Sequence, residues 1–184
     1  MFPERENKIA GVDEAGRGPL AGPIVAAAVI IEHGDFKDSK KLTAKARAKC
    51  YREIISNALA VSVAAVPPHI IDALDIRKAT LLAMRNAVVG LEIAPAMVLI
   101  DGRDEIPLLA VPQRAIIDGD ASISVIAAAS IVAKVARDAL MKAYSNRFRN
   151  FDFGKHKGYG TKQHYSEIDA FGETIIHRLS FRLR

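Results

Sequence analysis

A continuous run of eight apolar residues, 24–31, constrains the fold of this chain most strongly. The run is rich in alanine and β-branched residues, and it lies between Pro23 and the polar turn residues 32–34. A short apolar run between turn residues is typical of a strand that is buried on both faces. Eight residues are also far fewer than the roughly 20 that a membrane-spanning helix needs. We therefore expect the chain to build its core around a buried strand.

The remaining hydrophobic periodicities predict an α/β fold. The expected elements are strand 9–14, strand 24–31, helix 43–59, strand 61–66, helix 70–89, strand 97–101, strand 115–117 and helix 121–144. Thr43 is the predicted N-cap of the first helix, and Gly90 the predicted end of the second. Strands followed by alternating helices and strands indicate a central mixed sheet flanked by helices. Residues 147–184 mix basic, aromatic and glycine residues, and we expect them to form a small appended element.

The charge is distributed unevenly along the 184 residues, whose formal net charge is +5. Residues 37–52 carry a local charge of +6 and residues 147–184 carry +4, which leaves −5 for the remainder. Two basic regions beside an acidic remainder are typical of a protein that binds a polyanion through those regions and has its carboxylates outside them. Solvated helix faces would give the same pattern, so nucleic-acid binding is a hypothesis at this point.

The composition also narrows the class of protein. The first eight residues lack the apolar core of a signal peptide. Cys50 is the only cysteine, which excludes an internal disulfide and a cysteine-based metal site. The five histidines have no zinc-binding spacing. We expect a cytoplasmic protein that makes no membrane contact.

Carboxylates follow the predicted strands. Asp13 and Glu14 close the first strand, Asp101 closes a central apolar strand, and Asp120 lies where a short strand leads into the long helix. Ligands of open sheets tend to bind at such strand ends. Carboxylates gathered there repel one another unless a cation lies between them, and Mg²⁺ prefers oxygen ligands. A pair of such ions about 3.5–4 Å apart can activate water and stabilise the leaving oxygen in phosphodiester cleavage.

Each of these carboxylates also has an ordinary structural explanation. Asp120 before a helix is typical of an N-cap, and Asp101 before a glycine is typical of a turn. Asp13 and Glu14 would point to opposite faces of a regular strand. Asp138 lies about 27 Å from Asp120 along a straight helix, so we expect it to have a structural salt-bridge or surface role.

Two further segments have the chemistry of nucleic-acid binding. The glycines of Gly16-Arg17-Gly18 would let the backbone approach a ligand, and a sugar 2′-hydroxyl is a group that backbone atoms can read. Residues 155–162 interleave cations and glycines with Tyr159, which suits phosphates and a base or sugar face. The alternatives are a tight turn between strands for the first segment and a basic surface loop for the second.

Residues 13–23, DEAGRGPLAGP, closely resemble the opening signature of the bacterial ribonuclease HII family, a type 2 ribonuclease H. Further segments resemble that family's later blocks in the family's order. They are residues 38–42, 100–102, 119–121, 126–138, 156–164 and 177–181. Together these blocks span nearly the whole chain.

The resemblance implies a ribonuclease H-like fold, with a catalytic domain over residues 1–146 and a small basic C-terminal helical element, residues 147–184, that completes the substrate groove. It implies an endoribonuclease that cuts the RNA strand of RNA–DNA hybrids and nicks 5′ of single ribonucleotides in duplex DNA, leaving 3′-hydroxyl and 5′-phosphate ends. The expected partners are these nucleic acids, with no protein-partner motif and a monomeric chain. The alternatives are another ribonuclease H-like nuclease and a non-catalytic nucleic-acid binder.

The resemblance also implies roles for individual residues. The implied catalytic residues and ligands of Mg²⁺ or Mn²⁺ are Asp13, Glu14, Asp101 and Asp120. The implied contacts to the ribose 2′-hydroxyl are Gly16, Arg17 and Gly18, while Tyr159 would stack on the adjoining deoxyribose. Backbone phosphates would be held by Ser39, Lys40 and Lys41. Asp118 departs from the family pattern, in which a basic residue usually stands two positions before the helix-start aspartate.

Overall fold

The computed structural model describes residues 8–36 and 42–182, and it is built on a five-stranded sheet with strand order β3-β2-β1-β4-β5. The strands are β1 Ile9–Ala15, β2 Ile24–Ile31, β3 Ala58–Val66, β4 Met97–Asp101 and β5 Gln113–Ile116. β2 is antiparallel to β1 and β3, whereas β4 is parallel to β1 and β5. The predicted mixed sheet is therefore confirmed.

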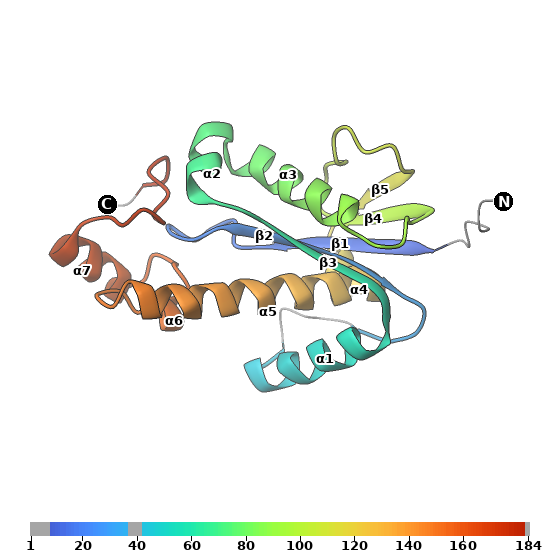
Figure 1. Ribbon diagram of the computed structural model, residues 1–184, viewed down its shortest axis with the longest axis horizontal. Coiled ribbons are helices and arrows are strands. Elements are labelled where there is room, and N and C mark those ends of the chain that lie inside the picture. Colours follow the sequence, from blue (N-terminus) through green and yellow to red (C-terminus); the bar gives the residue numbers. More distant parts are fainter. Residues whose placement is uncertain (1–7, 37–41, 183–184) are drawn as a thin grey trace.

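Helices cover both faces of the sheet. They are α1 Ala44–Asn57, α2 Pro68–Leu74, α3 Ile76–Val89, α4 Gly119–Ser122, α5 Ser124–Arg147, α6 Phe153–His156 and α7 Lys162–Phe171. Figure 1 shows α2 and α3 on one face, α1 and α5 on the other, and α6 and α7 at one end of the molecule. No helix in the described part of the chain is long and apolar enough to span a membrane.

Strand β2, which the sequence predicted to be buried, is covered on both faces. Ala26 and Ala28 of β2 face the core cluster that contains α3, whereas Ala27 and Val29 face the cluster that contains α5. A strand covered by helices on both sides has no polar face, which explains its continuous apolar run. Its alanines let the helices pack close to the sheet.

Two predicted helices are wrong in their extent. The expected helix 70–89 is broken at Asp75, which has φ 76° and caps α3 by accepting a hydrogen bond from the Lys78 backbone N–H. The expected helix 121–144 is divided at Ile123, whose extended backbone separates α4 from α5. Apolar spacing continues across both breaks, so periodicity alone concealed them.

A close approach between β1 and α5 fixes the middle of the sheet. A Cβ atom on Gly11 would overlap the carbonyl group of Val125 and the backbone nitrogen of Ile126, so only glycine fits there. This approach places the second half of β1, including Asp13, directly beside α5. The strand and the long helix thus carry side chains into one shared site.

The C-terminal segment packs against α5 and the loop that precedes β2. Ala21, Met141, Phe153 and Ile168 belong to one core cluster. The backbone N–H groups of Leu20 and Ala21 donate to the Gly158 carbonyl, at 2.8 and 3.3 Å. The loop after β1 is therefore held between the C-terminal segment and the sheet.

Candidate active site

Three of the four predicted carboxylates line one cavity at the C-terminal ends of two neighbouring parallel strands. Val12 of β1 pairs with Ile100 of β4, so Asp13 and Asp101 come next on adjacent strands. Asp13, Glu14 and Asp101 line a cavity of about 310 Å³. Although Asp13 and Glu14 are adjacent, both reach this cavity at the end of β1, where the chain turns at Gly16 with φ 103°.

Asp120 lies beside Asp101 and is 2% exposed. The backbone N–H groups of Gly119 and Asp120 both donate to Asp101 Oδ1, at 2.8 and 3.4 Å. The N-cap of α4 is Asp118 rather than Asp120, and the Asp118 side chain makes no capping hydrogen bond. The simple N-cap explanation of Asp120 is therefore wrong, and the short helix α4 brings Asp120 next to Asp101.

Burial and mutual repulsion oppose ionisation of these carboxylates. Burial, followed by the charge of Glu14, raises the pKa of Asp13 well above its usual value, although a hydrogen bond with Ser130 opposes the shift. Burial also raises the pKa of Glu14, and Arg17 opposes this shift from 3.5 Å. The charge of Asp101 raises the pKa of both groups.

The carboxylate oxygens are the donors that Mg²⁺ and Mn²⁺ prefer, and a cation among them would relieve this repulsion, so the donor set fits such ions. Within residues 8–36 and 42–182, however, no three Asp, Glu, His or Cys side chains are already arranged to hold a metal ion. The assignment of all four carboxylates as metal ligands stays a prediction.

The Gly16-Arg17-Gly18 loop and Tyr159 lie next to each other beside the carboxylates. Gly16 and Tyr159 line the same cavity as Asp13. A Cβ atom on Gly18 would lie 3.8 Å from Tyr159 Cε1, which places the loop against the tyrosine ring. Tyr159 is 43% exposed, so its ring is available to a ligand.

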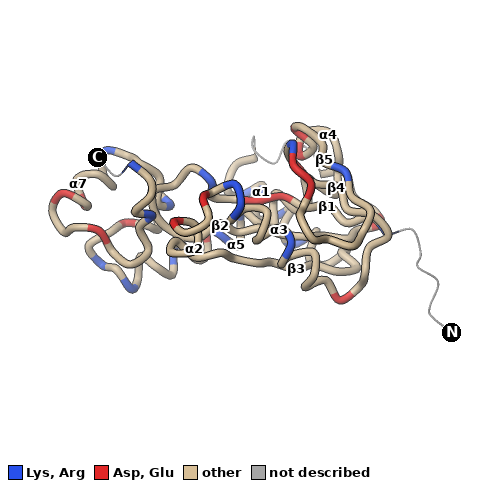
Figure 2. The backbone as a smooth tube through the Cα atoms, turned by 90° about the horizontal axis from the view of Figure 1, so that it is seen from above, with Lys and Arg blue, Asp and Glu red and all other residues tan. Residues whose placement is uncertain are grey.

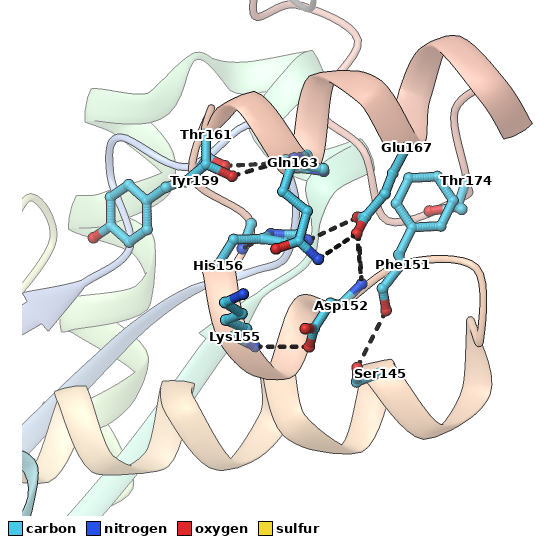
Figure 3. A network of polar contacts seen from close by, with 12 residues as sticks. Ser145, Phe151, Asp152, Lys155, His156, Tyr159, Thr161, Gln163, Glu167 and Thr174 are labelled. Carbon is cyan, nitrogen blue, oxygen red and sulfur yellow. Dashed lines mark hydrogen bonds and ion pairs between the residues drawn. The ribbon is translucent and has the colours of Figure 1, made fainter.

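A buried polar network holds the backbone around Tyr159 (Figure 3). The His156 ring contacts Glu167 at 2.9 Å and accepts a hydrogen bond from the Gly158 N–H. His164 Nδ1 lies 3.0 Å from the Tyr159 carbonyl oxygen. Figure 3 shows the Tyr159 ring pointing away from this network. The network therefore fixes the backbone and leaves the ring free to face the cavity.

The cavity contains cations that the sequence did not single out. Arg47 of α1 and Lys134 of α5 line it together with Ser130. Ser130 and Lys134 are four residues apart and so share a helix face, a polar pair in an otherwise apolar stretch that could have indicated them. Figure 2 shows acidic and basic positions interspersed along the molecule, in its middle as well as at both ends.

Other predicted residues have different outcomes. Asp138 forms an ion pair with Lys134 at 2.8 Å, which confirms the expected structural salt bridge. Asp118 is exposed at the start of α4. The predicted phosphate contacts Ser39, Lys40 and Lys41 lie outside the described residues.

Known proteins are similar to this chain in sequence and in fold. The family model of ribonuclease HII matches residues 10–184. A ribonuclease HII of Caldicellulosiruptor bescii is 50% identical over 94% of this chain and 85% of its own length. A ribonuclease HII of Syntrophus aciditrophicus is 49% identical over 96% of this chain and 84% of its own length.

Two solved structures agree with the sequence comparisons. Ribonuclease H2 of Pyrococcus horikoshii is similar with a TM-score of 0.79 and 26% identity, over 96% of this chain and 94% of that chain. Ribonuclease HII of Archaeoglobus fulgidus, solved in a complex with PCNA, is similar with a TM-score of 0.81 and 27% identity, over 96% of both chains. The fold is therefore ribonuclease H-like, and the chain belongs to the ribonuclease HII family, hydrolases that act on RNA–DNA substrates as ribonuclease H endonucleases.

Proposed function

We propose that this enzyme nicks duplex DNA on the 5′ side of a single embedded ribonucleotide and also cuts the RNA strand of RNA–DNA hybrids. The observation that carries this proposal is one cavity lined by Asp13, Glu14 and Asp101 together with Gly16 and Tyr159. Carboxylates suited to phosphodiester hydrolysis thus lie beside a glycine loop suited to a 2′-hydroxyl and an aromatic face suited to a sugar.

The proposed reaction is in-line attack of water on the scissile phosphate, giving 3′-hydroxyl and 5′-phosphate ends. Two divalent ions, Mg²⁺ or Mn²⁺, held by Asp13, Glu14, Asp101 and Asp120, would activate the water and stabilise the leaving oxygen. The Gly119 N–H keeps one Asp101 oxygen in place, at 2.8 Å, and the Glu14 N–H holds one Asp13 oxygen at 2.6 Å. These bonds orient the carboxylates before substrate arrives.

The substrate would be held on both sides of the carboxylates. Arg47 and Lys134 supply cations for backbone phosphates from the cavity wall. The 16–18 loop would contact the ribose, and Tyr159 would stack on the following deoxyribose. Residues 147–184 would then act as an element that completes the groove of the catalytic domain, residues 1–146.

The test uses a labelled DNA duplex that carries one ribonucleotide. Wild-type protein is incubated with Mg²⁺, with Mn²⁺ and with chelator, beside the same duplex without the ribonucleotide. Asp101→Asn removes one carboxylate charge but keeps an oxygen for the Gly119 N–H, so it is the matched variant. We expect a metal-dependent nick immediately 5′ of the ribonucleotide, at least about 100-fold slower with Asp101→Asn.

Three results would contradict the proposal in different ways. Equal cutting of the all-DNA duplex would indicate a ribonuclease H-like DNA nuclease. Cleavage of long hybrids without the single-ribonucleotide nick would contradict recognition of the RNA–DNA junction by Tyr159. Tight binding with no cleavage of either substrate would indicate a non-catalytic binder.

A further inference from the structure

Two arginines lie completely buried beneath the loop that connects β1 and β2. Arg137 of α5 and Arg178 of the C-terminal segment are both 0% exposed. Neither forms an ion pair with a carboxylate of the described residues, although burial of an uncompensated charge is costly. Burial lowers the pKa of Arg178 to about 9, which leaves the group protonated at neutral pH. Their acceptors therefore have to be sought in the backbone.

Both guanidinium groups donate to backbone carbonyls, but they hold different parts of the loop. Arg137 donates to the carbonyls of Pro23, Ala21 and Lys157, at 3.0–3.1 Å. Arg178 donates to the carbonyls of Gly22, Arg17 and Gly16, at 2.9, 3.0 and 2.6 Å. Arg178 thus holds the two peptide groups at the centre of the predicted ribose-contact loop.

Because a peptide group is planar, holding its carbonyl also fixes the direction of the N–H group in the same plane. The Gly16 carbonyl shares its peptide plane with the Arg17 N–H, and the Arg17 carbonyl shares its plane with the Gly18 N–H. In a trans peptide the two groups point in opposite directions. Because Arg178 holds both carbonyls inward, both N–H groups point outward. Arg17 and Gly18 are exposed, and within the described chain neither N–H donates a hydrogen bond.

The backbone of Arg178 is itself held from two sides. Its N–H donates to the Leu20 carbonyl at 2.8 Å. The next two residues donate their N–H groups to Asp72 of α2, each at 3.0 Å. The centroid of the Phe181 ring lies 5.1 Å from the guanidinium carbon. The side chain therefore reaches the loop from a backbone anchored on α2, independently of any ligand.

We propose that Arg178 is a positioning residue for ribose recognition: it aims the Arg17 and Gly18 N–H groups at the 2′-oxygen without touching the substrate itself. The inference rests on the proposed function, because it assumes that this loop reads the ribose. A deoxyribose offers these donors no acceptor, so the discrimination between ribose and deoxyribose at this position depends on Arg178.

The test measures binding in an Asp101→Asn background, which separates recognition from cleavage. Affinities for a duplex with one ribonucleotide and for the same all-DNA duplex are measured by fluorescence anisotropy. Arg178→Lys keeps the charge but offers one donor nitrogen in place of the three guanidinium nitrogens that reach the three carbonyls. We expect the ratio of the two affinities to fall by about tenfold or more, with all-DNA affinity unchanged.

A stability control distinguishes positioning from general loosening of the fold. Val88→Ala removes buried volume from the far end of α3, and we expect it to lower the melting temperature while leaving the affinity ratio intact. An unchanged ratio in Arg178→Lys would overturn the inference, and so would an equal loss in Val88→Ala. If the parent protein itself shows no ribose preference, the proposed ribose reading by this loop fails, and the inference fails with it.

Discussion

Asp13 is a buried carboxyl group, and its burial opposes ionisation. The side chain is 3% exposed and lies beside Glu14, and both effects raise its pKa. A carboxyl whose pKa is higher in the folded state than in the unfolded state destabilises the fold once it ionises. The penalty is present at neutral pH, shrinks as the pH falls below the raised pKa, and is gone below the pKa of the unfolded state. Such a cost is typical of a site kept for its chemistry.

We therefore expect Asp13→Asn to stabilise the metal-free protein and to abolish cleavage. The amide oxygen can still accept the Glu14 N–H, but the buried charge is gone. The expected gain is about 1 kcal/mol at pH 7.5, or a rise of about 2–4 °C in Tm, and it should shrink at pH 5. Thermal melts in chelator measure it. A lower Tm for the variant at pH 7.5 would show that the charge is not the dominant cost.

A divalent ion should have the same effect on the wild-type protein, because it neutralises the repelling carboxylates. Mg²⁺ or Mn²⁺ is expected to raise the Tm of wild type more than that of Asp13→Asn. An equal rise in the Tm of wild type and of Asp13→Asn would mean that the ion binds away from Asp13.

At the scale of elements, hydrophobic periodicity predicted the strands and the long helices well. It could not predict the breaks at Asp75 and Ile123, because a single residue with non-helical backbone leaves the apolar spacing on either side unchanged. It also gave no boundaries for α6 and α7, since the core they share is contributed partly by α5 and the loop before β2. Local apolar spacing does not predict contacts between segments that are far apart in the sequence.

The α7 helix carries a histidine whose titration should be visible in the stability of the protein. Burial lowers the pKa of His164 to about 4, and the neighbouring rings of His156 and His177 also lower it, while Tyr159 and Glu167 oppose the shift. His164 Nε2 lies 3.1 Å from His177 Nε2. A base whose pKa is lower in the folded state contributes stability that is complete above the unfolded pKa of about 6.5 and is lost as the pH falls toward 4.

His164→Asn should flatten this pH dependence. Asparagine retains a donor for the Tyr159 carbonyl but cannot titrate, so we expect a variant that is less stable at pH 7.5 and loses less stability between pH 6.5 and 4. The full contribution of His164 corresponds to as much as about 3 kcal/mol. Urea denaturation at several pH values measures the difference, and His33→Asn, at an exposed turn, is the control. Parallel curves for wild type and His164→Asn would contradict the prediction. Because Asp13 and Glu14 change stability in the opposite direction with pH, only the difference between variants isolates His164.

At the scale of the whole molecule, the sequence singled out the four carboxylates, the 16–18 loop and Tyr159 because each belongs to a recognisable local pattern, and their roles in binding and catalysis stay predictions. It did not identify Arg47, Lys134 or the role of Arg178. These residues come from α1, α5 and the C-terminal segment, and only the packing of those elements brings them to the end of β1. The net charge of +5 does not distinguish the cations that line the cavity from those that hold the backbone.

These two uses of positive charge predict different responses to salt. Arg47 lines the open cavity, where a phosphate contact would release a counterion, whereas Arg178 is buried and donates its hydrogen bonds to backbone carbonyls. Arg47→Ala should therefore weaken binding equally for ribonucleotide-containing and all-DNA duplexes, and reduce the slope of log K against log salt by about 1. Arg178→Lys should leave that slope unchanged.

Anisotropy titrations at several salt concentrations, in the Asp101→Asn background, separate the two cases. Arg85→Ala is the matched control, because the Arg85 guanidinium is directed to the Leu108 carbonyl rather than to the cavity. An unchanged slope for Arg47→Ala would exclude a phosphate contact at the cavity wall. A reduced slope for Arg178→Lys would mean that the buried arginine acts through its charge. The distinction between a phosphate-binding Arg47 and a loop-positioning Arg178 would then fail.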